Sequence, residues 1–449
     1  MPAAPTILSL AADLAAGRTT SVALTEAAFD RIADPAGEGA RAFTLADRDG
    51  ALAAAQASDA MRRLGVVPSP LAGLPVSVKD LFDVAGQVTT AGSVALKDAP
   101  AAERDAPVVA RLRAAGAVIV GRTNMTEFAF SGLGLNPHYG TPGNPHDRGR
   151  IPGGSSSGAA VSVADGMAVA AVGSDTGGSV RIPAALCGLA GFKPTQARVP
   201  RDGAVPLSWT LDSVGPLARS IACCAVLDAV LAGQAPSVPD EADVQGLRIG
   251  VPKCHALDGL DATVSTAFER ALSALSRRGA RVVEFAMPAL DRVPQANAKG
   301  GFSPPEAYSW HRDLLERRGE SYDPRVRVRI LRALEQSAAD YVDLVRARRA
   351  LMAESDAASR GFDALAMPTV PVVAPRFEEL AEDVDYARIN LLVLRNPSLW
   401  NFLDRPAVTL PVGAAGLPVG LMLVGRRGHD RALLSVARGV ESVVVRPGG

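Results

Sequence analysis

Residues 152–188 read PGGSSSGAAVSVADGMAVAAVGSDTGGSVRIPAALCG and contain two glycine-rich loops that carry serines, Gly153–Gly158 and Gly173–Ser179. Only glycine adopts positive φ at little cost, so such loops can aim backbone N–H groups at a reacting oxygen. One short segment can then hold both a nucleophilic hydroxyl and the donors for an oxyanion. The pair of loops therefore favours a site in which a serine acts as nucleophile.

Lys79 lies far upstream of these loops, directly after the mostly apolar run Leu74–Val78. Each feature has an ordinary explanation when taken alone. A lone lysine is usually solvated, and Lys79 could pair with Asp80. Gly177-Gly178 is typical of a turn, and the serines of the first loop are typical of a helix N-cap. It is their joint occurrence that favours catalysis.

Around the loops the sequence predicts alternating strands and helices. Leu74–Val78 and Ala117–Val120 are short runs rich in β-branched residues and predict strands. Pro107–Ala115 lies between them and predicts an amphipathic helix, which gives β-α-β connectivity and parallel pairing. Ser157–Ala171 predicts a helix of small residues that follows the first loop.

The ends of the chain add further helices. Residues 7–65 have helical spacing, with Ser9 or Thr20 and Ser21 as N-caps. Residues 325–360 predict a long charged helical stretch.

Residues 406–425 carry no charge and are long enough to cross a bilayer. Their three prolines and four glycines would break a helix repeatedly. We therefore predict two buried strands, 407–411 and 419–424, joined by a turn at 413–416.

Composition limits the functional classes. Lys+Arg and Asp+Glu both total 47 in 449 residues, and no basic stripe or polybasic patch occurs, which argues against nucleic acid and membrane partners. Four cysteines without C-x-x-C spacing and an N-terminus without a signal peptide predict a cytoplasmic protein with reduced thiols. The five histidines show no metal-ligand spacing, and we expect neither metal nor cofactor.

The ordered motifs of this chain resemble those of the amidase signature family of serine hydrolases. The resemblance is densest over residues 71–233 and returns more thinly near the C-terminus. It rests on the segments 73–80, 121–129, 152–158, 177–188, 191–195, 211–216, 362–369 and 416–421.

The resemblance implies one α/β body over residues 1–449, with a central mixed, mostly parallel sheet flanked by helices. Within it we distinguish an N-terminal helical segment, a signature core, a variable region suited to substrate-specific elements, and the C-terminal part of the core. These four parts span residues 1–65, 71–233, 234–361 and 362–449, respectively. The family resemblance also suggests a homodimer.

The resemblance further implies hydrolysis of a carboxylic acid amide to an acid and ammonia or an amine, through an acyl-enzyme. The implied residues are Ser179 as nucleophile, Ser155 as bridging serine after a cis peptide bond, and Lys79 as base. The oxyanion donors would be the backbone N–H groups of Thr176, Gly177, Gly178 and Ser179. Met125 and Thr126 correspond to a segment that lines the pocket in the family, with buried core as the alternative. Trp209 is expected either in the pocket wall or in core packing. Asp175 and Arg181 flank the nucleophile, and we expect them to pair as a brace of its loop.

Two alternatives compete. Residues 154–158 also fit G-x-S-x-G, the nucleophile elbow of α/β-hydrolases, which would make Ser156 the nucleophile with His255, His311 or His429 as its base. The second alternative is a glutamine-hydrolysing subunit of a tRNA-dependent amidotransferase, which shares the signature and passes ammonia to a partner. Nucleotide binding is weakly indicated, because neither loop has a phosphate-binding pattern.

Overall fold

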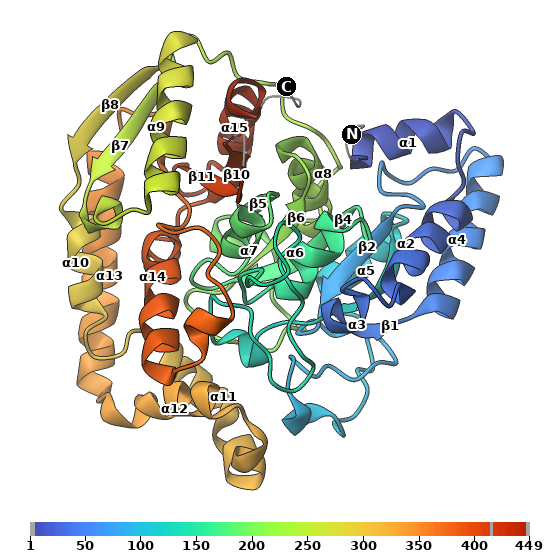
Figure 1. Ribbon diagram of the computed structural model, residues 1–449, viewed down its shortest axis with the longest axis horizontal. Helices are drawn as coiled ribbons and strands as arrows, with labels where there is room; N and C mark the ends of the chain where they lie inside the picture. Colours follow the sequence, from blue (N-terminus) through green and yellow to red (C-terminus); the bar gives the residue numbers. More distant parts are fainter. Residues whose placement is uncertain (1–4, 414–415, 446–449) are drawn as a thin grey trace.

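A single eleven-stranded sheet runs through the protein, which is described by a computed structural model over residues 5–413 and 416–445 (Figure 1). The order of the strands is β1-β3-β2-β4-β6-β5-β10-β11-β9-β7-β8. The strands are β1 Phe43–Ala46, β2 Pro75–Lys79, β3 Val118–Thr123, β4 Ala170–Asp175, β5 Ala190–Lys193, β6 Ser213–Ala218, β7 Arg248–Lys253, β8 Arg281–Ala286, β9 Ala364–Pro368, β10 Ala407–Val412 and β11 Val419–Val424.

The sheet is mixed, as predicted, but it is not mostly parallel. Parallel pairs occur in two groups, β3-β2-β4 and β9-β7-β8. The six remaining neighbour pairs among the described strands are antiparallel. The prediction of mostly parallel pairing was wrong because it extended to the whole sheet a β-α-β pattern that the sequence shows only around β2 and β3. The centre of the sheet is antiparallel and includes a direct connection from β10 to β11.

Helices cover both faces of the sheet (Figure 1). They are α1 Ile7–Ala15, α2 Ser21–Ala33, α3 Gly39–Ala42, α4 Arg48–Arg63, α5 Pro107–Ala114, α6 Ser157–Ala164, α7 Arg181–Leu186, α8 Ile221–Leu231, α9 Ala262–Arg277, α10 Ala289–Ala296, α11 Ser303–Arg318, α12 Pro324–Leu331, α13 Ala338–Ala358, α14 Asp383–Phe402 and α15 Asp430–Val444.

The uncharged C-terminal segment forms the centre of this layered core. Along β11, Leu421 and Leu423 pack into one apolar cluster, whereas Met422 and Val424 pack into another. A strand buried on both faces needs a continuous apolar run. The two predicted strands are thus confirmed as the antiparallel pair β10 and β11, although residues 414–415 of the predicted turn lie outside the described residues. No described helix is long and apolar enough to cross a bilayer.

The helix predicted over 157–171 ends earlier than expected. The α6 helix stops at Ala164, and the residues from Ala170 onward form strand β4. Small apolar residues suit both a tightly packed helix and a buried strand, so composition could not place the boundary. Similarly, the predicted helical stretch 325–360 divides into α12, a 3₁₀ turn and α13, because Ser337 caps a new helix.

The N-terminal segment is helical but also contains the short edge strand β1. Thr20 caps α2, as predicted. The cap of α1 is Thr6 rather than Ser9, and the Ser9 side chain instead completes the reciprocal hydrogen bonds of a capping box.

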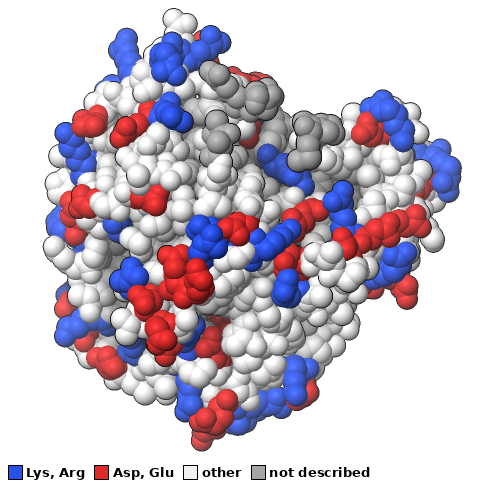
Figure 2. Space-filling model, viewed as in Figure 1, with Lys and Arg blue, Asp and Glu red and all other residues white. Residues whose placement is uncertain are grey.

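The surface carries charges of both signs. On the face drawn in Figure 2, the described Lys and Arg side chains lie among Asp and Glu rather than forming one continuous basic surface.

Candidate active site

Two parallel strands bring Lys79 and Ser174 to the same edge of the sheet. Lys79 is the last residue of β2, and Val78 lies opposite Val172 of β4. Lys79 Nζ lies 2.8 Å from Ser174 Oγ and 2.7 Å from Ser155 Oγ, which belongs to the first glycine loop. The lysine side chain is fully buried. The predicted base is therefore held between two serine hydroxyls.

The burial of Lys79 decides its charge. Loss of solvent lowers the pKa of Lys79 to about 7, although the carboxylates of Asp175 and Asp212 act in the opposite direction. The two groups that bond to its amine are neutral hydroxyls and do not compensate a full positive charge. A substantial fraction of the amine is thus neutral near pH 7 and can accept a proton.

Backbone hydrogen bonds join the two glycine loops. The peptide bond between Gly154 and Ser155 is cis. Ser156 N donates to Ser179 O at 3.2 Å, and Thr126 N donates to Ser155 O at 3.1 Å. The two loops therefore lie side by side, with Ser155 and Ser179 held in one buried region.

The N–H groups around Ser179 are not equivalent. Gly178 N donates to Asp175 Oδ1 at 2.8 Å, so this predicted oxyanion donor is already engaged. Gly178 has a φ of 128°, and a Cβ there would lie 2.6 Å from Pro397 Cγ, which explains the glycine. Thr176, Gly177 and Ser179 line the large cavity described below.

Asp175 and Arg181 brace the nucleophile loop, as the sequence suggests. Arg181 donates to both carboxylate oxygens of Asp175, at 3.0 and 2.9 Å, and both side chains are fully buried. Asp175 also accepts from Val180 N, and from Asn401 Nδ2 on α14. Burial by itself raises the pKa of Asp175, but Arg181, Lys193 and Asn401 together hold it well below its usual range.

Replacing Arg181 by methionine should lower the free energy of unfolding by about 3–5 kcal/mol, because it leaves Asp175 buried without its partner. Urea denaturation would measure this change. The matched control is Arg388→Met, which breaks the exposed pair between Arg388 and Asp385 and should change stability little. If Arg181→Met and Arg388→Met lowered the free energy of unfolding equally, the buried pair would not stabilise the loop more than an exposed one.

A cavity of about 310 Å³ opens beside Ser179. Its walls come from the loops before Ser131 and around Ser179, from α14, and from residues 297–332 of the variable region. Met125 and Thr126 are fully buried and are not among its lining residues. Thr126 contributes a backbone bond to the first loop, and Met125 packs in the core.

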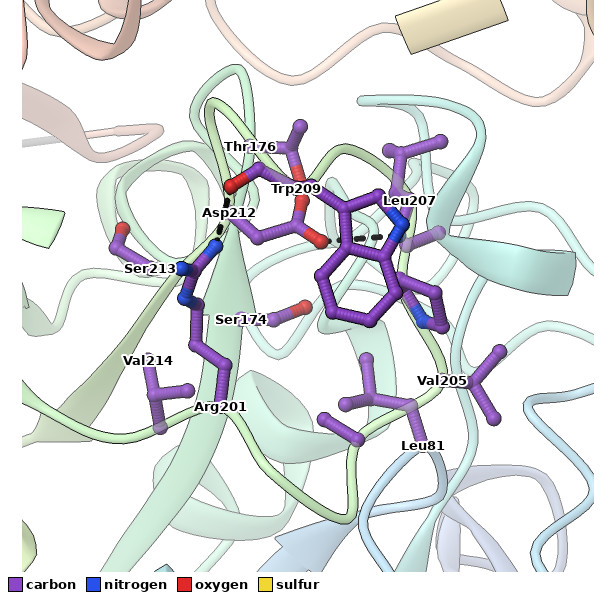
Figure 3. Close-up of a pocket in the computed structure, with 13 residues that line it drawn as sticks. Leu81, Ser174, Thr176, Arg201, Val205, Leu207, Trp209, Asp212, Ser213 and Val214 are labelled. Carbon is purple, nitrogen blue, oxygen red and sulfur yellow. Dashed lines mark hydrogen bonds between the residues drawn. The ribbon is translucent and has the colours of Figure 1, made fainter. Parts of the chain in front are cut away.

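A second, much smaller cavity of about 20 Å³ lies next to Ser174. Figure 3 shows the indole ring of Trp209 over it, with Asp212 and Thr176 alongside. Trp209 is 55% exposed and lines this cavity but not the large one. Trp209 thus closes a space of the size of about one water molecule.

Asp212 fastens the nucleophile loop to the 207–212 turn. Its carboxylate accepts from Thr176 Oγ1 at 2.6 Å and from the backbone N–H groups of Leu207 and Ser208. Burial raises the pKa of Asp212 to about 6, against these hydrogen bonds, which lower it. Ser174 and Asp212 were not singled out from the sequence, although both lie in motifs that were, and only strand pairing shows their proximity to Lys79 and Thr176.

The elbow alternative gains no support from the geometry. Ser156 Oγ donates to Ser174 O at 3.4 Å, and none of the hydrogen bonds found among residues 5–413 and 416–445 joins it to a histidine. His255 pairs with Asp291 and His311 with Tyr322, and His429 precedes α15. Within these same ranges, no three His, Cys, Asp or Glu side chains are grouped so that they could hold a metal ion.

Known proteins are similar to this chain over most of its length. A family model named Amidase matches residues 23–434. The 2-amino-5-chloromuconic acid deaminase of Comamonas testosteroni is 40% identical, with 88% of this chain and 87% of that protein covered. A glutamyl-tRNA(Gln) amidotransferase subunit of Roseiflexus sp. strain RS-1 is 37% identical, with 95% of this chain and 94% of that protein covered.

Solved structures agree with these matches. A crystal structure of an amidase superimposes with a TM-score of 0.89 at 37% identity, covering 98% of this chain and all of that one. The peptide amidase of Stenotrophomonas maltophilia superimposes with a TM-score of 0.82 at 29% identity, covering 100% and 99%. With the family model and these relatives matching most of its length, the chain belongs to the amidase family and is a hydrolase of carbon–nitrogen bonds in amides.

Proposed function

We propose that Ser179, Ser155 and Lys79 form the catalytic relay by which this chain hydrolyses a small carboxylic acid amide. The observation that carries the proposal is the fully buried Lys79 amine, 2.7 Å from Ser155 Oγ, with its pKa lowered to about 7. A base must be largely neutral at the working pH, and burial favours the neutral form of the Lys79 amine.

In the proposed reaction, neutral Lys79 accepts the proton of Ser155 while Ser155 accepts the proton of Ser179. The Ser179 oxygen attacks the amide carbon, and the tetrahedral oxyanion collapses as the proton returns to the departing nitrogen. Ammonia or an amine leaves and an ester remains on Ser179. Water then attacks this ester through the same relay and releases the acid.

For the oxyanion, we propose the backbone N–H groups of Thr176, Gly177 and Ser179. The N–H of Gly178 serves the loop instead, since it donates to Asp175. Backbone donors in a loop of fixed conformation stabilise the negative charge that develops on the oxyanion, because they do not have to reorient during the reaction.

A fluorophosphonate reagent should label Ser179 covalently, and peptide mapping of the labelled protein would locate the modified serine. Activity and labelling should survive exhaustive chelation of divalent metals. Labelling of Ser156 instead would support the elbow alternative and contradict the proposed relay.

A second candidate function is favoured by the likeness to glutamyl-tRNA(Gln) amidotransferase subunits, which reaches 37% identity over nearly full length. In that role the chain would hydrolyse glutamine and pass ammonia to a partner protein. Glutaminase activity together with copurification of that partner would support it. Turnover of small amides by the isolated chain, without a partner, would support the free-standing amidase.

The homodimer suggested by the family resemblance stays a prediction. Light scattering coupled to size-exclusion chromatography would measure the mass of the assembly directly.

A further inference from the structure

The large cavity beside Ser179 is positively charged. Among the residues that the structure describes, two arginines, Arg329 and Arg332, are the charged side chains of its lining, and no aspartate or glutamate lines it. Within residues 5–413 and 416–445, neither arginine lies in an ion pair. Elsewhere on the same helix, Arg325 pairs with Asp383 and Arg327 pairs with Glu320. The two cavity arginines therefore differ from their neighbours in lacking a carboxylate.

The two guanidinium groups stand on one side of the cavity. Arg329 lies near the end of α12, and Arg332 caps the helix three residues later, a spacing that puts side chains on the same helix face. Arg329 Nη1 donates to Phe130 O at 2.5 Å, and its guanidinium lies 5.1 Å from the centre of the Tyr386 ring. Arg329 is thus held in place, whereas no hydrogen bond joins the side chain of Arg332 to the described residues.

A neutral donor completes this wall. Asn390 Oδ1 accepts from Ser131 Oγ and from Gly132 N, both at 2.9 Å. These two bonds fix the orientation of the amide, and no hydrogen bond joins its Nδ2 to the described residues. Asn390 and Ser131 both line the cavity. Its lining therefore offers donors suited to an acceptor-rich ligand group.

We infer that Arg332, supported by Arg329 and Asn390, binds a carboxylate of the substrate, so that the enzyme hydrolyses amides whose acyl chain ends in an acid group. A guanidinium is planar, permanently charged and matched to both oxygens of a carboxylate. This inference rests on the proposed function of Ser179. It adds a substrate class, the ω-amido acids, and a residue that selects for it.

The experiment compares malonamate, succinamate and glutaramate with propionamide, butyramide and valeramide, which have acyl chains of the same length without the acid. The wild-type kcat/KM should favour the best amido acid over its neutral counterpart by about 10- to 100-fold, as expected for a charge-assisted hydrogen bond. Added salt should lower kcat/KM for the amido acid more than for the neutral amide.

Arg332→Gln should reduce that preference by about 10-fold or more, mainly through KM, and leave the neutral amides unchanged. Arg332→Lys should restore part of it. The matched control is Arg327→Gln, which removes the same charge from the same helix outside the cavity and should change neither substrate class.

A second readout does not require turnover. Glutarate, but not 1,5-pentanediol, should protect Ser179 of the wild type against a fluorophosphonate, and Arg332→Gln should lose this protection. The inference is overturned if neutral amides are hydrolysed as well as amido acids, or if Arg332→Gln keeps the wild-type preference or protection. Those results would leave the proposed function standing. Unchanged turnover in Ser179→Ala would instead remove the proposed function.

Discussion

Replacing Lys79 by alanine should lower kcat/KM by about 10⁴-fold and abolish its dependence on pH near neutrality. In the wild type, kcat/KM should rise with pH through one ionisation near pH 7, where the buried amine loses its proton. The rate rises rather than falls with pH because, below that pKa, Lys79 is protonated and cannot accept the proton of Ser155. The measurement is a pH–rate profile of kcat/KM on one good substrate.

A variant of Asp212 is the control for this pH profile. Burial raises the pKa of Asp212 to about 6, so Asp212 is a second group that ionises near neutrality. In Asp212→Asn the ionisation should persist but move to lower pH, since the Asp212 carboxylate raises the pKa of Lys79. If the rise of kcat/KM near pH 7 persists unchanged in Lys79→Ala, another residue is the base. Ser155→Ala should be nearly as slow as Lys79→Ala, and the double variant only slightly slower, because groups that act as a unit are not additive.

Ser179→Ala should lower kcat by about 10⁴-fold or more and remove fluorophosphonate labelling, because no acyl-enzyme can form. The fold should be retained, since the substitution removes one hydroxyl at the cavity wall. Steady-state kinetics and thermal unfolding on the same preparation would check both statements.

Ser156→Ala is the matched control for this substitution. Ser156 lies in the neighbouring loop and its hydroxyl donates to Ser174 O. Its loss should leave kcat within about tenfold of the wild type, as expected for removal of one hydrogen bond worth about 1 kcal/mol. Full activity in Ser179→Ala together with an inactive Ser156→Ala would reverse the assignment of the nucleophile.

Local residue patterns predicted many of the individual elements. The runs at 74–78 and 117–120 are the strands β2 and β3, the helix between them is α5, and the uncharged C-terminal segment is β10 and β11. Alternation of apolar residues, proline and glycine breaks, and side-chain caps act over a few residues and are therefore visible in a sequence. The two glycine loops and Lys79 were visible for the same reason.

Other features depend on residues far apart in the chain. The antiparallel centre of the sheet, the end of α6 at Ala164 and the strand β1 depend on which segments pair, and local composition fits more than one answer. The hydrogen bond from Gly178 N to Asp175, which removes one predicted oxyanion donor, likewise depends on how the nucleophile loop folds around that carboxylate.

By itself, the sequence determined the chemical groups of this protein: two serine loops, one lysine and the motifs of the amidase family. The tertiary structure alone decided what those groups can do. It buries the Lys79 amine between Ser155 and Ser174, which lowers its pKa to about 7, and it places Arg332 at the cavity of Ser179 with no ion-pair partner among the described residues. Desolvation and charge compensation depend on all the atoms around a group, and these atoms come from segments that are far apart in the chain, as Lys79 is from Ser155 and Ser174.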